Sequence, residues 1–265
     1  MHDHRTQEWL RPLRAQPSPA IRLICFPHAG GSATFFRDWA QWVPPGIDFV
    51  AVRYPGREGR FSEPFVDTIE EMADRVTEAL LPVLDVPVAI FGHSMGASVA
   101  HEVAIRLERR HGVVLQRLFV SARLAPQVLR PASRDSGDEA LLERIRLIGG
   151  AQTAAFDHPE LRELLLPVFR ADFRITDAYA PGRRALISSP ITGFAGNEDP
   201  AVPVPSMHAW ARSTSAAFDL QVFPGDHFYL VPCASAVVGA LAGRLVNPHR
   251  QESTSIAAER IIPPT

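Results

Sequence analysis

The fold of this chain is decided by residues 86–100, VPVAIFGHSMGASVA. The apolar run 86–91 predicts a buried strand, and the small and apolar residues that recur at helical spacing after Gly96 predict a helix. A G-x-S-x-G sequence between a strand and a helix forms a tight turn that lifts the serine clear of the sheet. A Cβ at Gly92 or Gly96 would meet neighbouring backbone in such a turn. We therefore predict that Ser94 is a nucleophile at a helix N-terminus, where developing negative charge is favoured.

Further apolar runs on both sides of this stretch predict more strands. They occupy residues 21–26, 49–53, 117–121, 191–194 and 220–223. Near-continuous apolar runs are typical of strands that are buried on both faces. Helical patterns separate them: Thr68 and Glu71 form a capping box, and Pro82 is expected to end the helix that follows. Strands that alternate with helices predict an α/β fold with a mostly parallel sheet.

The segment 127–181 breaks this alternation, because it carries helical patterns and no strand pattern. Ser136 is expected to cap a first amphipathic helix, which the pair Gly149-Gly150 ends. Asp157 is expected to N-cap a second helix, and Pro167 is expected to kink it. Two helices inserted between core strands predict a lid.

The predicted organisation is therefore a discontinuous core, residues 1–126 and 182–246, with a helical lid inserted at 127–181. The polar, proline-tipped end at 247–265 is expected to be a disordered tail.

Composition excludes several classes of function. The chain has 265 residues, a net charge of −2 and 46% hydrophobic residues, so charge alone predicts neither nucleic acid nor an anionic membrane as a partner. All 27 basic residues are Arg, which excludes a Schiff-base lysine, pyridoxal phosphate chemistry and a P-loop lysine. Cys25 and Cys233 stand far apart without a CxxC motif, so neither a disulfide framework nor a cysteine zinc site is expected.

The sequence predicts a cytoplasmic protein. Residues 1–14 lack the apolar core of a signal peptide. No run of about 18 apolar residues is present, so no membrane span is expected.

A serine hydroxyl needs a base within hydrogen-bonding reach. On this kind of turn the serine is followed along the chain first by an acid and then by a histidine. His227 follows the last predicted strand in the loop PGDHF, residues 224–228, and is the predicted base. His208 is the other late candidate, but it falls in a predicted helix.

The acid is expected in GNEDP, residues 196–200, which follows the strand 191–194. Asp199 is the predicted acid, because it would accept from one imidazole nitrogen, fix the tautomer and stabilise the imidazolium. Glu198 and Asp219 are alternatives. Asp226 adjoins the histidine, and its side chain is expected to point away from it.

The oxyanion of an acyl-transfer reaction requires two N–H donors. One is predicted to be the N–H of Met95, directly after the nucleophile, and the second comes from the loop after an early strand. The strand 21–26 runs into PHAGGS, residues 27–32. We assign the N–H of Ala29, with Gly30 as the alternative, and expect His28 to anchor the loop.

These motifs together resemble the type II thioesterases, stand-alone editing hydrolases of polyketide and nonribosomal peptide synthesis. The resemblance extends from about residue 9 to 245 and rests on FPHAGGS at 26–32, YPGRE at 54–58, GHSMG at 92–96, RAD at 170–172, GNED at 196–199 and GDHF at 225–228. One departure is Asp226, where many members have glycine.

The resemblance implies an α/β-hydrolase fold and a serine thioesterase with the triad Ser94, Asp199 and His227. It also implies the substrate, an acyl group on the phosphopantetheine arm of an acyl or peptidyl carrier protein. No cofactor and no metal are expected in this chain, since the pantetheine belongs to the partner. A monomer is expected. Three alternatives stay open: a small-molecule carboxylesterase or lipase, a chain-releasing cyclase, and a non-catalytic hydrolase fold that only binds a ligand.

The resemblance implies carrier proteins with acidic surfaces, so arginines in and near the lid are candidates to receive one; the alternative is that they are ordinary solvated charges. The candidates are Arg123, Arg130, Arg134 and Arg144.

Overall fold

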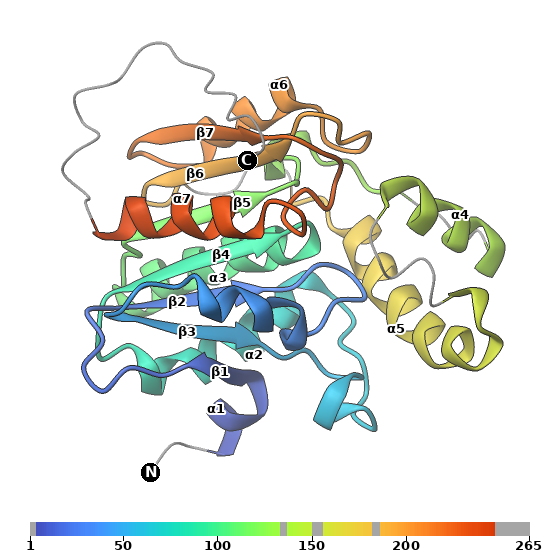
Figure 1. Ribbon diagram of the computed structural model, residues 1–265, viewed down its shortest axis with the longest axis horizontal. Helices are drawn as coiled ribbons and strands as arrows, with labels where there is room; N and C mark the ends of the chain where they lie inside the picture. The colour runs from blue at the N-terminus through green and yellow to red at the C-terminus, as the bar shows by residue number, and fades with distance from the viewer. Residues whose placement is uncertain (1–3, 133–136, 150–155, 182–185, 247–265) are drawn as a thin grey trace.

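A computed structural model describes residues 4–132, 137–149, 156–181 and 186–246. Its centre is a seven-stranded sheet with the strand order β1-β3-β2-β4-β5-β6-β7 (Figure 1). Only the edge strand β1 runs antiparallel to its neighbour, β3. The parallel arrangement of the other six strands places all their carboxyl ends along one edge of the sheet.

The strands confirm the apolar runs found in the sequence. They are β1 Leu10–Arg14, β2 Ile21–Phe26, β3 Ile47–Val52, β4 Val88–His93, β5 Arg117–Ser121, β6 Ile191–Gly196 and β7 Phe218–Phe223. Two of the predicted ranges, 21–26 and 117–121, match the structure, and the ends of the others differ by at most two residues. The sequence analysis missed β1, which lies at the edge, contains a proline and has an irregular register between Pro12 and Arg14. Such a strand has no continuous apolar run.

Helices cover both faces of the sheet. The α-helices are α1 His4–Trp9, α2 Ile69–Leu80, α3 Met95–His111, α4 Asp138–Ile148, α5 Pro159–Ala178, α6 Val204–Met207 and α7 Ala234–Val246. Short 3-10 helices add η1 Ala33–Gln41, η2 Glu58–Arg60, η3 Leu81–Val83, η4 Pro126–Val128 and η6 His208–Ser213. One apolar core joins α2 and α3 to the sheet, and a second core joins α7 and η1 to the opposite face. Strand β2 contributes alternately to both, with Ile24 in the first core and Cys25 in the second.

The capping box is present with one difference. Thr68 Oγ1 accepts the N–H of Glu71 at 3.0 Å, as predicted, but the Glu71 carboxylate accepts from the N–H of Asp67 rather than from that of Thr68. Helix α2 ends at Leu80, and the chain continues as η3 through Pro82.

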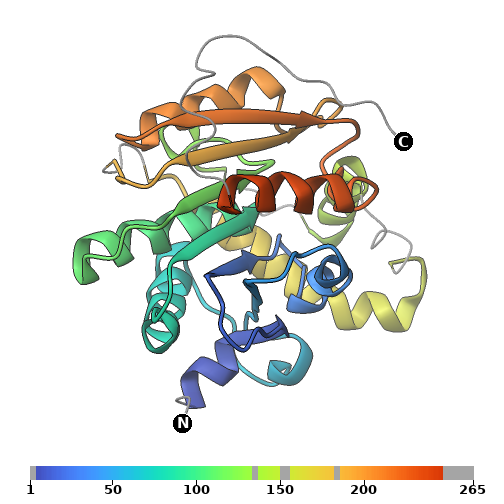
Figure 2. The same cartoon turned by 60° about the vertical axis from the view of Figure 1, so that its left-hand side comes forward.

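Helices α4 and α5 form the region predicted to be a lid. In Figures 1 and 2, α4 and the beginning of α5 lie to one side of the sheet layers. Ser136 and Gly150 lie outside the described residues. The N-cap of α4 is Gly137 rather than the predicted Ser136, and the helix ends at Ile148 with Gly149 as its C-cap, which has a φ of 82°. Helix α5 continues through Pro167.

The prediction that Asp157 caps α5 was wrong. The cap is His158, with φ −98° and ψ 115°, and the helix begins at Pro159. Proline disfavours the helical conformation of the residue before it and suits the first helical position. The extended residue therefore has to be His158.

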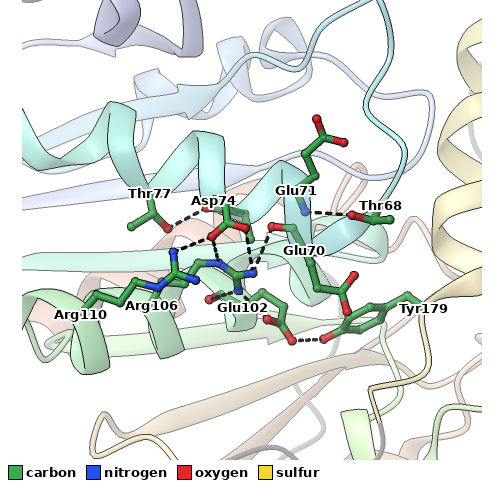
Figure 3. Close-up of polar contacts among 10 residues, drawn as sticks. Thr68, Glu70, Glu71, Asp74, Thr77, Glu102, Arg106, Arg110 and Tyr179 are labelled. Atoms are coloured by element: carbon green, nitrogen blue, oxygen red, sulfur yellow. Dashed lines mark hydrogen bonds and ion pairs between the residues drawn. The ribbon is translucent and has the colours of Figure 1, made fainter.

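The end of α5 is tied to the core by a buried polar network (Figure 3). The hydroxyl of Tyr179 donates to Glu102 Oε1 on α3 at 2.7 Å. Arg106 donates to Glu102 Oε2 at 2.5 Å and to Asp74 Oδ1 on α2 at 2.7 Å. Arg110 also binds Asp74, at 2.6 Å, from the surface. The base of the lid is thus fastened to the helix that starts at Ser94.

Replacing Tyr179 by Phe should lower the free energy of unfolding by about 1.5–3 kcal/mol, because it removes a buried hydrogen bond to a charged group. Urea denaturation measures the loss. The matched control is Arg110→Gln in the same network: Arg110 is 57% exposed, and an exposed ion pair contributes only about 0.2–1 kcal/mol. An equal loss in both variants would contradict the anchoring role of Tyr179.

Candidate active site

Ser94 occupies a strained turn between β4 and α3. Its backbone has φ 54° and ψ −119°, and its N–H donates to the carbonyl of Ser121 on β5 at 2.8 Å. A Cβ at Gly92 would lie 2.4 Å from the carbonyl oxygen of Gly96, and one at Gly96 would lie 2.2 Å from that of Phe26. Backbone atoms cannot move aside as a flexible side chain could. Both glycines are therefore required, as the motif predicted.

His227 lies between Ser94 and Asp199. Its Nε2 is 3.0 Å from Ser94 Oγ, and its Nδ1 is 2.8 Å from Asp199 Oδ2. Because a carboxylate can only accept, Nδ1 carries the proton and Nε2 presents its lone pair to the serine hydroxyl. Asp199 and His227 are buried, at 6% and 3% exposure. The structure thus brings the three predicted side chains into one hydrogen-bonded chain.

The loops that carry the acid and the histidine are joined to each other. The N–H of Glu198 donates to the carbonyl of Gly225 at 2.9 Å, and the N–H of Gly225 donates to Asn197 Oδ1 at 2.9 Å. Asp199 Oδ1 accepts the N–H groups of Ala201 and Val202, at 2.8 and 3.2 Å. The carboxylate is therefore fixed before it binds the imidazole.

The alternative acids and the alternative base point elsewhere. Glu198 is exposed, and Asp219 on β7 accepts from Arg244 Nε at 3.0 Å. Asp226 Oδ1 accepts the N–H of Phe228 at 2.7 Å, so this residue closes its own loop and leaves the imidazole to Asp199. His208 packs its ring near Phe218.

The geometry favours Ala29 over Gly30 as the second oxyanion donor. The N–H of Gly30 is already engaged, since it donates to Asp172 Oδ2 at 2.7 Å. Within the described part of the chain, neither the N–H of Ala29 nor that of Met95 has a protein acceptor. The loop that carries Ala29 and the turn that carries Met95 follow the adjacent strands β2 and β4, and they come close together, since a Cβ at Gly96 would lie 2.5 Å from the carbonyl oxygen of Pro27.

Behind the triad, the sequence analysis missed a second network. His93 Nδ1 is 2.8 Å from Ser121 Oγ, which is 2.6 Å from the hydroxyl of Tyr229. The His93 ring lies 5.1 Å from the ring of His227, between centroids. Burial, followed by the nearby His227 and His28, holds the pKa of His93 well below its usual value. A neutral His93 adds no charge beside the base. The sequence feature that could have indicated this network is the histidine within the GHSMG motif, His93.

The low pKa of His93 makes stability depend on pH. The unfolded chain binds a proton at this position as the pH falls through about 6.5, whereas the folded chain does not. Stability is therefore present above pH 6.5 and is lost below it, by up to about 1.4 kcal/mol per pH unit for this one proton.

His93→Asn retains a polar atom for Ser121 but cannot take up that proton. We expect a shallower fall in the free energy of unfolding between pH 6.5 and 5 than in the unaltered protein, measured by urea denaturation across this range. Parallel pH profiles for the two proteins would contradict the assignment to His93.

Two of the arginines expected to receive an acidic partner are engaged within the structure. Arg123 Nε donates to Ser98 Oγ at 2.8 Å, and burial lowers the pKa of Arg123 to about 10. Arg144 forms a two-pronged ion pair with Asp177, at 2.5 and 2.7 Å. Arg123 is half-buried and packed against α3, whereas Arg130 is exposed and Arg134 lies outside the described residues. The contact of these arginines with an acidic partner stays a prediction.

Among the residues that the structure describes, no three His, Cys, Asp or Glu side chains are grouped to hold a metal ion. No helix in the described ranges is long and apolar enough to cross a membrane.

The thioesterase domain family matches residues 21–245. The chain belongs to the thioesterase family. Among its relatives is the thioesterase PikA5 of Streptomyces venezuelae, which is 38% identical over 224 residues, 84% of this chain and 80% of PikA5. The family membership makes this protein a thioesterase, and the two backbone donors and the triad lie within the matched range.

Solved structures agree with this assignment. The type II thioesterase BorB from the borrelidin biosynthetic cluster is 38% identical, with a TM-score of 0.82 over 89% of this chain and 97% of BorB. YbtT, a type II thioesterase from the yersiniabactin NRPS/PKS biosynthetic pathway, is 28% identical, with a TM-score of 0.78 over 89% of this chain and 97% of YbtT. The predicted α/β-hydrolase fold and the resemblance to type II thioesterases are both confirmed.

Proposed function

We propose that this thioesterase hydrolyses acyl groups from the phosphopantetheine arm of carrier proteins, and that it removes stalled or mis-primed units in polyketide or nonribosomal peptide synthesis. The observation that carries the proposal is the hydrogen-bonded chain from Ser94 through His227 to Asp199. The pathways of BorB and YbtT support the substrate class. The partners are the acyl or peptidyl carrier domains of a synthase.

The first half of the reaction transfers the acyl group to the enzyme. Ser94 Oγ attacks the thioester carbonyl while His227 Nε2 takes the hydroxyl proton. The negative charge that develops on the carbonyl oxygen is met by the N–H groups of Ala29 and Met95. Asp199 stabilises the imidazolium through Nδ1. The C–S bond then breaks, and the pantetheine sulfur takes the proton from His227 and leaves as the free thiol.

The second half releases the acid. His227 takes a proton from a water molecule, whose oxygen attacks the ester carbonyl of acylated Ser94. The same two N–H groups hold the second oxyanion, and Ser94 Oγ leaves with the proton from His227. Each step uses only side chains and backbone of this chain; we propose that it acts as a monomer without a cofactor of its own, the pantetheine being part of the substrate.

Replacing Ser94 by Ala should abolish acyl release, with a loss on the order of 10⁶ in kcat for a triad nucleophile, and should leave the melting temperature nearly unchanged. Acyl-carrier protein assayed by intact-protein mass spectrometry measures release. Simple esters assayed in parallel distinguish a carrier thioesterase from a carboxylesterase. Wild-type turnover in Ser94→Ala would overturn the assignment.

Asp199→Asn should lower kcat by about 10⁴, because an amide can donate to the imidazole and hold the wrong nitrogen protonated. Asp226→Asn is the matched control in the histidine loop: its side chain binds the N–H of Phe228 and not the imidazole, so kcat should change less than about tenfold. A larger loss in Asp226→Asn than in Asp199→Asn would show that the acid is misassigned.

A further inference from the structure

The predicted oxyanion donor Ala29 lies in a β-turn that is hydrogen-bonded to residues from two other segments of the chain. The carbonyl of His28 accepts the N–H of Gly31 at 2.9 Å, and Gly30, the third residue of this turn, has φ 76°. A positive φ at the third residue is the mark of a type II turn, and the dihedral angles of such a turn set the orientation of the peptide units on either side of Ala29. The direction of the Ala29 N–H therefore depends on whether the turn keeps this form.

Two buried charged residues form hydrogen bonds with the backbone of this turn. Asp172 Oδ2 accepts the N–H of Gly30 at 2.7 Å, and Arg57 donates to the carbonyl of Gly31 at 3.0 Å. Arg57 and Asp172 also pair with each other through two hydrogen bonds, at 2.6 and 2.8 Å. Their exposed fractions are 6% and 2%. The pair thus contacts the peptide unit that follows Ala29, through the N–H of Gly30, and the peptide unit that follows Gly31, through its carbonyl.

These hydrogen bonds join three segments that are distant in the sequence: the turn, the loop after β3 and helix α5. Arg57 lies in the loop after β3, and Asp172 lies in the middle of α5. The ring of Phe169, one turn earlier on α5, fills the space beside Gly30, where a Cβ would lie 2.2 Å from it. Tyr54 adds a hydrogen bond from its hydroxyl to the carbonyl of Pro27 at 3.3 Å. The position of α5 and the form of the turn are therefore coupled.

Stability does not explain the choice of these side chains. A buried ion pair can often be replaced by apolar residues without loss of stability, because desolvation offsets the attraction. The pair does, however, solve an electrostatic problem. A lone carboxylate next to the oxyanion would repel it, and the Arg57 guanidinium cancels the charge of Asp172 while leaving its oxygen to hold Gly30.

We propose that Arg57 and Asp172 are positioning residues for the oxyanion hole: they fix the direction of the Ala29 N–H and make that direction depend on the seating of α5. This inference rests on the proposed function, since it takes the oxyanion as real. According to this inference, the reaction also requires two charged residues that act through the turn and not by contact with the substrate.

The test compares catalysis with the binding of a tetrahedral adduct. A short acyl-pantetheine thioester reports kcat and KM. A trifluoromethyl ketone reports oxyanion stabilisation. Ser94 Oγ adds to its carbonyl, and the former carbonyl oxygen then lies in the oxyanion hole as an anion. Asp172→Ala should lower kcat by about 10²–10³ with KM within about threefold, and weaken ketone binding by a similar factor.

Two further proteins separate positioning from folding. Arg57→Met combined with Asp172→Leu removes both charges, so unfolding stability should return toward that of the unaltered protein while kcat and ketone binding stay low. Asp177→Asn is the matched control: it breaks another two-pronged arginine pair on α5, with Arg144, that does not contact the turn. It should change kcat and ketone binding less than about threefold.

The outcomes also separate this inference from the proposed function. Failure of a fluorophosphonate to label Ser94 in the unaltered protein would overturn both. Normal labelling, together with recovery of kcat in the double variant or an equal loss in Asp177→Asn, would overturn the positioning role alone. A kcat loss without weaker ketone binding would do the same.

Discussion

The close approach of α3 to the carboxyl end of the sheet is the constraint on which the site depends. At Gly96 the helix comes so near to the backbone of Phe26 that no side chain fits, and at Gly92 the turn leaves no more room. The chain must therefore pass through Ser94 with a positive φ, which is costly for a residue with a side chain. This strain fixes the nucleophile and the N–H of Met95 together. Because β2, β6 and β7 run parallel to β4, their loops meet at the same edge.

Helix α3 positions both the nucleophile and the base of the lid. Its first turn follows Ser94, and two turns later Glu102 binds the hydroxyl of Tyr179 at the end of α5. One helix therefore fixes the reacting oxygen and the base of the lid. Earlier on α5, Asp172 binds the turn that carries Ala29. The lid is thus attached by specific polar contacts at defined points, in addition to its apolar packing in the main core.

Features that depend on residues close together in the sequence could be predicted from it, whereas features that depend on contacts between distant segments could not. Ser94, Asp199 and His227 were found because strand-end loops in a parallel sheet meet at a known edge, and β2 and β5 because their apolar runs are continuous. The edge strand β1 has no such run. Arg57 and Asp172 both stand in segments that carry the resemblance, 54–58 and 170–172. Their pairing joins residues 115 apart, and no local pattern in either segment predicts that the two side chains meet. The hydrogen bonds of Arg123 to Ser98 on α3 and to the carbonyl of Thr176 on α5 likewise follow from tertiary packing and from no local pattern.

The pair formed by Arg57 and Asp172 also limits how this protein can be recombined with its relatives. A chimaera that exchanges residues 127–181 imports a new partner for Arg57, which stays behind in the core. If the donor lid lacks an acidic residue at the position of Asp172, the guanidinium is left buried and uncompensated, which lowers the free energy of unfolding by about 3–5 kcal/mol however well the apolar surface of the lid matches. The lid and the loop after β3 are therefore best exchanged together, and crossover points that keep both from one parent should yield the more stable hybrids.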